Sequence, residues 1–426
     1  MPTLPHAWRL GALALATALL VACGGGTPSP EPSPDNSSTA ASIDPGSTDA
    51  RLQASALRSP PPSLASVGER LFREPRLSAS GKLSCAGCHV AAQAHADPAG
   101  SFLPVGGLGM DQQGLRSSPS LRYLNGTPAF SLDEQGRPRG GLFWDGRASD
   151  RVAQARGPLF AAQEMANTDV ASYVRRLRTA PAFADLLSAS GLPASASDAQ
   201  LLEASLQALA RYQQQDAAFA PFSSKFDAVQ DGRARFSEAE ARGFAAFTDP
   251  RKGNCAACHS ASPPPTAPAG ARALFTNHGY FALGVPRNRS VATQDPTFFD
   301  LGLCGPQRSD LSAQAALCGR FRVPSLRNVA LTAPYFHNAR FQTLEEVVGF
   351  YATRDLDPAR WYPVVNGQVK RYDDLPAVYQ GNVHRGPPFD RRPGQLPALS
   401  PQDVTDIVSF LKTLSDGYQG PAGAPL

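Results

Sequence analysis

The sequence contains two copies of the pattern Cys-x-x-Cys-His, Cys85-x-x-Cys88-His89 and Cys255-x-x-Cys258-His259, and these constrain its fold most strongly. Two thiols three residues apart on one helical turn can each bond a haem vinyl carbon, and the adjacent histidine can then ligate the iron. The alternatives are a redox dithiol, which would follow a strand, and a zinc site, which would need more Cys or His nearby. Neither motif follows a β-branched run, and only His95 follows the first motif closely. We therefore expect two covalently bound haem c groups.

About one domain length of chain separates the two motifs, and the signals around them are mainly helical. The pattern of leucines predicts a helix over 198–212. Other helix starts are indicated by capping boxes or a Ser-Pro pair at Ser66, Ser237, Thr343 and Ser400, and Gly417 is expected to stop the last helix. No stretch shows convincing strand alternation. We predict an all-α chain of two tandem cytochrome c-like haem domains, residues 63–230 and 231–420.

The N-terminus has the pattern of a bacterial lipoprotein signal peptide over residues 1–22. Its apolar run, 10–21, is shorter than a membrane-spanning helix needs, and it ends at Cys23, the expected site of lipid attachment. A plain secretory signal and an uncleaved anchor are the alternatives. Residues 23–62, rich in Gly, Pro and Ser, are expected to be a disordered tether. These features predict a periplasmic protein on a lipid anchor, with Gly24 favouring the outer membrane.

Composition supports a folded core and excludes one class of partner. The 426-residue chain is 42% hydrophobic and 18% charged, with a net charge of +4 and no Arg/Lys run, so we expect no nucleic-acid partner. Cys304 and Cys318 are left after the haem motifs and Cys23 are assigned. In an oxidising compartment we expect them to form a disulfide, with two free buried thiols as the alternative.

The order of motifs over residues 64–418 resembles the bacterial di-haem cytochrome c peroxidase and MauG family. The motifs outside the haem sites are Gly68-x-x-Leu71-Phe72, Pro75-Arg76-Leu77-Ser78, Arg116-Ser117-Ser118-Pro119, Phe143-Trp144-Asp145-Gly146-Arg147-Ala148, Gln154-Ala155, Gln163-Glu164-Met165, Pro324-Ser325-Leu326-Arg327-Asn328 and Ala333-Pro334-Tyr335-Phe336-His337. The combination is more specific than any single motif.

The resemblance implies that peroxide reacts at the His89 haem. Glu164 matches the distal acid/base carboxylate, and Gln154 matches the neighbouring distal glutamine. A carboxylate over the iron can take a proton from one peroxide oxygen and return it to the other. Trp144 matches the tryptophan that relays electrons between the haems. The alternatives are a surface helix acid for Glu164 and a core aromatic for Trp144.

Two departures from the peroxidase pattern concern the axial ligands. Peroxidases that need reductive activation carry a distal histidine where Leu108 stands here, so we expect an open sixth site, with Met110 as an alternative ligand. The second haem of the peroxidases has a methionine ligand, but no methionine follows Cys258. Tyr351 matches the tyrosine ligand of MauG-type enzymes, and an anionic phenolate lowers the iron potential. A core tyrosine at 351, with His337 as ligand, is the alternative.

The family often binds one calcium ion, and the resemblance implies such a site here. Thr332 and Pro334 match its carbonyl donors, and oxygen ligands suit Ca²⁺. Ser117 stands where an asparagine usually contributes its side chain.

The resemblance implies a di-haem peroxidase of MauG type, which uses hydrogen peroxide to form high-valent haem and oxidise a donor. The donor would be a small cytochrome c, a cupredoxin or a residue of a protein substrate. The alternatives are a cytochrome c peroxidase that detoxifies peroxide with electrons from a carrier, and a non-enzymatic electron-transfer di-haem cytochrome c. The missing methionine disfavours both.

Overall fold

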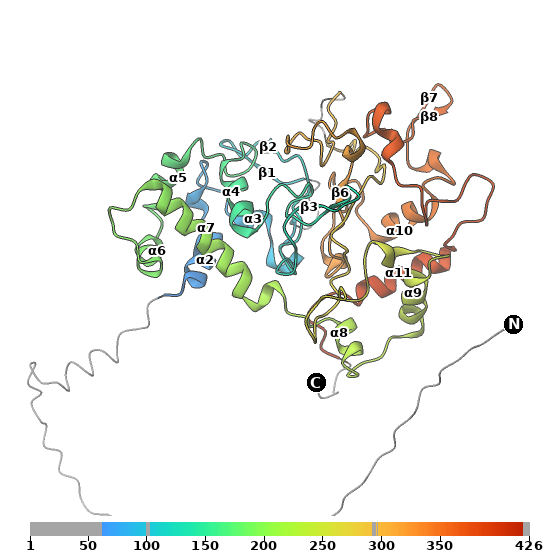
Figure 1. Cartoon of the computed structure of the whole chain (residues 1–426), viewed down its shortest axis with the longest axis horizontal. Coiled ribbons are helices and arrows are strands. Elements are labelled where there is room, and N and C mark those ends of the chain that lie inside the picture. The colour runs from blue at the N-terminus through green and yellow to red at the C-terminus, as the bar shows by residue number, and fades with distance from the viewer. Residues whose placement is uncertain (1–61, 99–102, 292–294, 296, 421–426) are drawn as a thin grey trace, which may run out of the picture. The chain divides into compact units, whose positions relative to one another are not determined.

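The computed structural model describes residues 62–98, 103–291, 295 and 297–420. The predicted signal peptide, Cys23 and the predicted tether up to residue 61 lie outside the described residues. The chain from Pro60 onwards forms one compact unit (Figure 1). No helix in the part of the chain that the structure describes is both long enough and apolar enough to span a bilayer.

Helices provide most of the regular structure, as expected. The α-helices are α2 (Leu64–Phe72), α3 (Cys85–Cys88), α4 (Arg151–Phe160), α5 (Val170–Leu177), α6 (Phe183–Ser190), α7 (Asp198–Gln215), α8 (Lys225–Gln230), α9 (Glu238–Thr248), α10 (Leu344–Thr353) and α11 (Pro401–Lys412). Short 3-10 helices are η1 (Pro75–Leu77), η2 (Ala91–Gln93), η3 (Ala217–Phe219), η4 (Cys255–Ala257), η5 (Ala315–Leu317), η6 (Val329–Leu331), η7 (Pro358–Arg360) and η8 (Ala377–Asn382).

Short strands, which the sequence analysis did not predict, accompany these helices. They form antiparallel pairs of two residues each: β1 (Val105–Gly106) with β2 (Gln112–Gln113), β3 (Ser131–Leu132) with β4 (Pro138–Arg139), β5 (Tyr280–Phe281) with β6 (Phe321–Arg322), and β7 (Val364–Val365) with β8 (Gln368–Val369). Strands this short cannot show alternation, so periodicity could not reveal them.

Side-chain caps fix most of the helix starts that the sequence predicted. Capping boxes are present at Ser237 of α9, Thr343 of α10 and Ser400 of α11. The prediction at Ser66 is wrong by one turn, because Ser63 is the N-cap of α2 and accepts a hydrogen bond from the Ser66 amide at 3.1 Å. The last helix ends at Lys412, before Gly417, because the chain leaves helical hydrogen bonding at Thr413.

A glycine lets one helix approach another closely in each half of the chain. In the N-terminal half α2 packs along α7, and a Cβ on Gly68 would lie 1.9 Å from the carbonyl oxygen of Ala208. In the C-terminal half α9 packs along α11, and a Cβ on Gly243 would lie 1.9 Å from the carbonyl oxygen of Asp406. Figure 1 shows α2 and α7 together in blue and green, and α9 beside the red α11. Only glycine allows this backbone approach.

Each helix pair belongs to its own buried apolar cluster. The first cluster includes Leu71 of α2, Leu159 of α4 and Leu206 of α7. The second includes Phe247 of α9 and Phe410 of α11, where aromatic rings pack edge to face or at a tilt. Burial of these side chains is the main contribution to the stability of each half.

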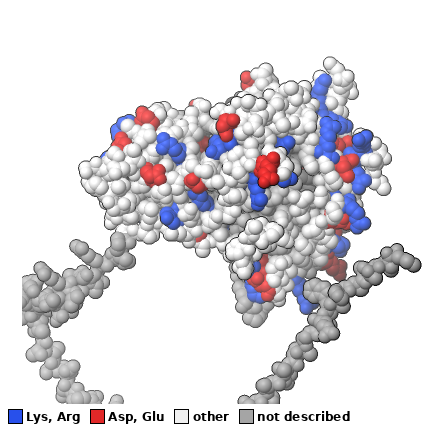
Figure 2. Space-filling model, viewed as in Figure 1, with Lys and Arg blue, Asp and Glu red and all other residues white. Residues whose placement is uncertain are grey.

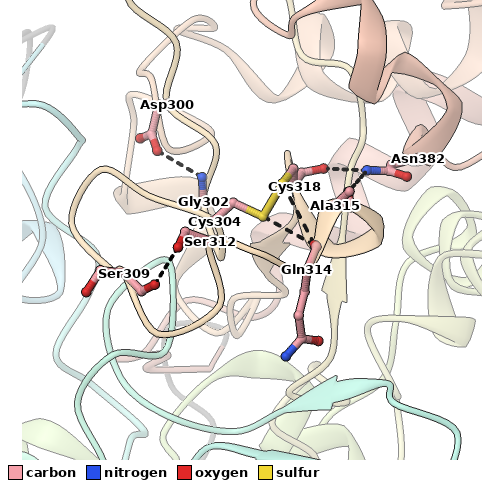
Figure 3. The surroundings of a disulfide bond; sticks show 9 residues. All are labelled: Asp300, Gly302, Cys304, Ser309, Ser312, Gln314, Ala315, Cys318 and Asn382. Carbon is pink, nitrogen blue, oxygen red and sulfur yellow. Dashed lines mark hydrogen bonds between the residues drawn. A yellow bond between two sulfur atoms is a disulfide. The ribbon is translucent and has the colours of Figure 1, made fainter.

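A disulfide joins Cys304 to Cys318 and closes a loop in the C-terminal half (Figure 3). The side chain of Asn382 donates hydrogen bonds to the carbonyls of Ala315 at 2.8 Å and Cys318 at 3.0 Å. Arg308, inside the loop, donates to the backbone carbonyl of Asp145 at 2.9 Å. The disulfide loop is thereby fixed against the N-terminal half.

Charged side chains of both signs are intermixed on the visible face, and most of that face is uncharged (Figure 2). This agrees with the small net charge of +4. Lys and Arg are most frequent along the right-hand edge of this view, with a few acidic side chains among them.

Candidate functional site

The first Cys-x-x-Cys-His motif lies on α3, with its histidine held by the backbone. The Nδ1 atom of His89 donates to the carbonyl oxygen of His95 at 3.0 Å, which leaves Nε2 free to act as a ligand. Burial lowers the pKa of His89 to about 4, so the imidazole is neutral at physiological pH. His95 itself stacks on Phe219 at 4.3 Å between ring centroids and is absent from the lining of the cavity beside His89.

The second motif repeats this arrangement on η4. The Nδ1 atom of His259 donates to the carbonyl oxygen of Phe275 at 3.0 Å, and burial lowers its pKa to about 4. The carbonyl groups of His95 and Phe275 are functional groups that the sequence did not reveal, because backbone atoms carry no residue-type signal.

Each motif opens onto its own cavity, and the lining residues fit a haem group. The first cavity is lined by Cys85, Cys88 and His89, and the second by Cys255, Cys258 and His259, in both cases among largely apolar side chains. The four cysteines are not joined in disulfides, so their thiols are available for thioether bonds. A neutral, oriented imidazole beside two thiols in an apolar cavity is the donor set that haem c requires.

Glu164 and Gln154 both line the first cavity. Gln154 lies on α4, and Glu164 lies in the turn after that helix, where its amide donates to the carbonyl of Ala161 at 3.0 Å. The turn packs directly on β1, because a Cβ on Gly106 would lie 2.8 Å from the carbonyl oxygen of Glu164. The amide of Gly107, at φ +82°, donates to that oxygen at 2.8 Å. Gly106 of β1 and the following Gly107 thus hold the backbone of Glu164 beside the first cavity.

The charge of Glu164 depends on burial and on Arg147. Burial raises the pKa of Glu164, and the positive charge of Arg147 opposes this rise. Arg147 also lines the first cavity and donates to Asp145 at 2.9 Å, while its guanidinium lies 3.6 Å from the centroid of the Phe143 ring. In the sequence, Arg147 stood out only as a member of one of the family motifs. The structure adds Arg147 to the polar groups of this cavity.

Tyr351, on α10, lines the second cavity. Its ring packs 5.1 Å from that of Phe389 and 6.3 Å from that of Phe336. Among the described residues its hydroxyl has no hydrogen-bond partner, whereas the hydroxyl of Tyr335, in the same lining, donates to the carbonyl of Val329 at 3.0 Å. A phenol in an apolar lining normally has a hydrogen-bond partner, so the absence of one for Tyr351 among the described residues fits a ligand role.

Trp144 lines both cavities. Its indole nitrogen donates to the carbonyl of Ser117 at 2.9 Å, which fixes the ring between the two haem sites. The predicted relay residue therefore lies where the two cavities approach each other.

The remaining sequence-predicted residues lie elsewhere or have other contacts. Leu108 is 71% exposed, and neither it nor Met110 belongs to the lining of the first cavity. His337 lines the second cavity but stacks on Phe321, with 3.5 Å between ring centroids. Ser117 donates its hydroxyl to the carbonyl of Phe336 at 2.8 Å.

Comparison with known proteins identifies relatives of the whole described chain. Residues 62–235 match the family model of the di-haem cytochrome c peroxidases. The chain is 38% identical over 369 residues to the methylamine utilization protein MauG of Paracoccus denitrificans, covering 83% of this chain and 89% of that protein. It is 28% identical over 359 residues to the cytochrome c551 peroxidase of Pseudomonas aeruginosa, covering 82% of this chain and 78% of that protein.

A solved structure shares the fold. The di-haem peroxidase BthA of Burkholderia thailandensis superimposes with a TM-score of 0.76 at 38% identity, covering 90% of this chain and 92% of that one. A helix-rich fold, two Cys-x-x-Cys-His cavities and these relatives agree with one another. The chain belongs to the di-haem cytochrome c peroxidase family, and it is a peroxidase with two haem cofactors.

Proposed function

We propose that this chain is a di-haem peroxidase of MauG type. The observation that carries the proposal is the difference between its two cavities. A carboxylate and an amide, Glu164 and Gln154, line the first, whereas a phenol without a partner, Tyr351, lines the second. The proposal includes covalent haem c at both motifs, with His89 and His259 as ligands and Tyr351 as a second ligand of the C-terminal haem.

Reduction of hydrogen peroxide to two waters consumes two electrons and two protons. A haem held by Cys85, Cys88 and His89 would supply an iron centre that exchanges electrons with peroxide. Glu164 takes a proton from one peroxide oxygen and returns it to the departing oxygen, since its raised pKa brings it nearer to the pH at which it must do both. Gln154 orients peroxide by hydrogen bonding, and the apolar walls exclude bulk water.

The remaining parts of the proposal concern electron supply and location. Electrons come from a small cytochrome c, a cupredoxin or a residue of a protein substrate, and Trp144 relays them between the cavities. The two halves are tandem cytochrome c-like domains, 63–230 and 231–420, of a periplasmic protein anchored through lipid on Cys23. Gly24 after that cysteine favours the outer membrane as the site of the anchor. Carbonyl groups of Thr332 and Pro334 bind calcium.

The test is to add one equivalent of hydrogen peroxide to the fully oxidised protein and follow the Soret band. An immediate and long-lived spectral change supports the MauG-type proposal. Reaction only after partial reduction would instead show a cytochrome c peroxidase that needs activation. No reaction in either state would show an electron-transfer cytochrome.

A further inference from the structure

A buried arginine lies between the two cavities. Arg322 is the second residue of β6, and it belongs to the lining of both the first and the second cavity. Its amide donates to the carbonyl of Trp144 at 2.9 Å. Within the described residues, Trp144 and Arg322 are the two that both linings share.

The side chain of Arg322 differs from the other buried arginines in having no partner. Arg322 is 7% exposed, yet no ion pair or side-chain hydrogen bond joins it to any residue in the described ranges. Other buried arginines have partners: Arg151 with Gln213 and Asn125, Arg308 with Asp310, Arg327 with Asp227, and Arg354 with Asp355.

The carboxylates of the two linings are committed to other cations. Asp300 accepts from Arg116 at 2.6 Å, and Asp374 lies 3.2 Å from Arg287. Glu164 interacts with the charge of Arg147. A buried cation without a counter-ion destabilises a fold. We therefore expect the anion that pairs with Arg322 to be part of the cofactors that occupy the two cavities.

We propose that the guanidinium of Arg322 binds propionate carboxylates of both haems and so forms one cationic clamp between the two cofactors. Each haem brings two carboxylates, and a guanidinium offers five donors suited to planar acceptors. The proposal rests on the proposed function, because it requires a haem in each cavity. It assigns to Arg322 a role in binding both cofactors and in setting their potentials together.

A positive charge beside both haems stabilises the reduced state of each, because reduction adds a negative charge. Removing that charge from the clamp must therefore move both midpoint potentials in the same direction, towards more negative values. If Arg322 contacted only one haem, its removal would shift the midpoint potential of that haem alone.

The experiment compares the holoprotein with R322Q, R322K and R320Q by haem content and potentiometric titration. Arg320 lies two residues earlier and lines neither cavity, so R320Q is a control for loss of a nearby charge. We expect R322Q to shift the midpoint potentials of both haems to more negative values and R322K to keep both close to the wild-type values. R320Q should leave the potential of the N-terminal haem unchanged. Loss of haem from R322Q but not from R322K also supports the clamp.

Unchanged potentials in R322Q, or a shift confined to one haem, would overturn the clamp while leaving the proposed function intact. Loss of haem from R322Q and R322K alike would show a role in folding and overturn it as well. Fewer than two covalent haems in the wild-type protein would overturn the proposed function itself, and with it the clamp.

Discussion

The two cavities orient their motif histidines in the same way and differ in the other polar groups that line them. In both, the histidine donates from Nδ1 to a backbone carbonyl at 3.0 Å. In contrast, α4 and the turn after it bring Gln154 and Glu164 to the first cavity, while α10 brings Tyr351 to the second. The motif thus determines how each haem is held, and residues far from it determine what each haem does.

Under the proposed function, the first cavity admits an exchangeable substrate, whereas the second holds a permanent ligand of the haem iron. Polar groups that accept and release protons suit a cavity where a small substrate enters. A phenol packed between Phe336 and Phe389 suits a permanent ligand, because the rings restrict its motion. Exchange of these groups between the halves would reverse the asymmetry on which the proposed function depends.

Substitution of Glu164 by Gln is expected to have the largest effect. Glutamine keeps the shape of the side chain but cannot shuttle a proton, so peroxide consumption should slow by about 10²-fold or more. Stopped-flow measurement of the Soret change gives the rate. Glu203→Gln on α7, which accepts from Gln207 outside both cavities, is the control and should react normally. An unchanged rate in Glu164→Gln would remove this carboxylate from the mechanism.

Substitution of Tyr351 by Phe is expected to change the second haem and spare the first. Loss of the phenolate should open a coordination position and raise the potential of that haem by ~0.1 V or more. Electron paramagnetic resonance and potentiometry measure both changes. Tyr335→Phe removes a hydroxyl from the same lining that already donates to a carbonyl, so it is the matched control. Equal spectra for Tyr351→Phe and the wild type would exclude ligation.

The sequence predicted the helices and the residues that line each cavity. It did not predict the hydrogen-bond partners that orient those residues. Side-chain identity and spacing carry the signal for Glu164 and for the capping box at Ser237. The supports of the histidines are backbone carbonyls, and the unpaired state of Arg322 depends on which carboxylates the fold places nearby. These facts arise from tertiary packing. The N-cap of α2 was misplaced because serines at 63 and 66 offer similar local signals.

Substitution of Gly68 or of Gly243 by Ala is expected to destabilise the protein, and the two effects should be similar in size. A Cβ at Gly68 or Gly243 would lie 1.9 Å from a carbonyl oxygen, so the helices must separate. The loss should be about 1–3 kcal/mol, which exceeds the ~1 kcal/mol gain in helix propensity. Thermal denaturation of the holoprotein measures it. Gly381→Ala, where nothing lies within 4 Å of the added Cβ, is the control. A wild-type melting temperature in Gly68→Ala or Gly243→Ala would refute the close approach.

Substitution of Arg147 by Leu should have the smallest effect, a displacement of the pH profile. Glu164 acts as a base only when ionised, so kcat/KM falls as the pH drops through its pKa. Burial raises that pKa and Arg147 holds it down, so removing the cation must move the acidic limb to higher pH. Arg147→Lys retains the charge and should keep the wild-type limb, while Asp145 retains Arg116 at 2.7 Å in both variants. If the acidic limbs of the pH profiles of kcat/KM coincide for Arg147→Leu and the wild type, Arg147 does not influence the pKa of Glu164.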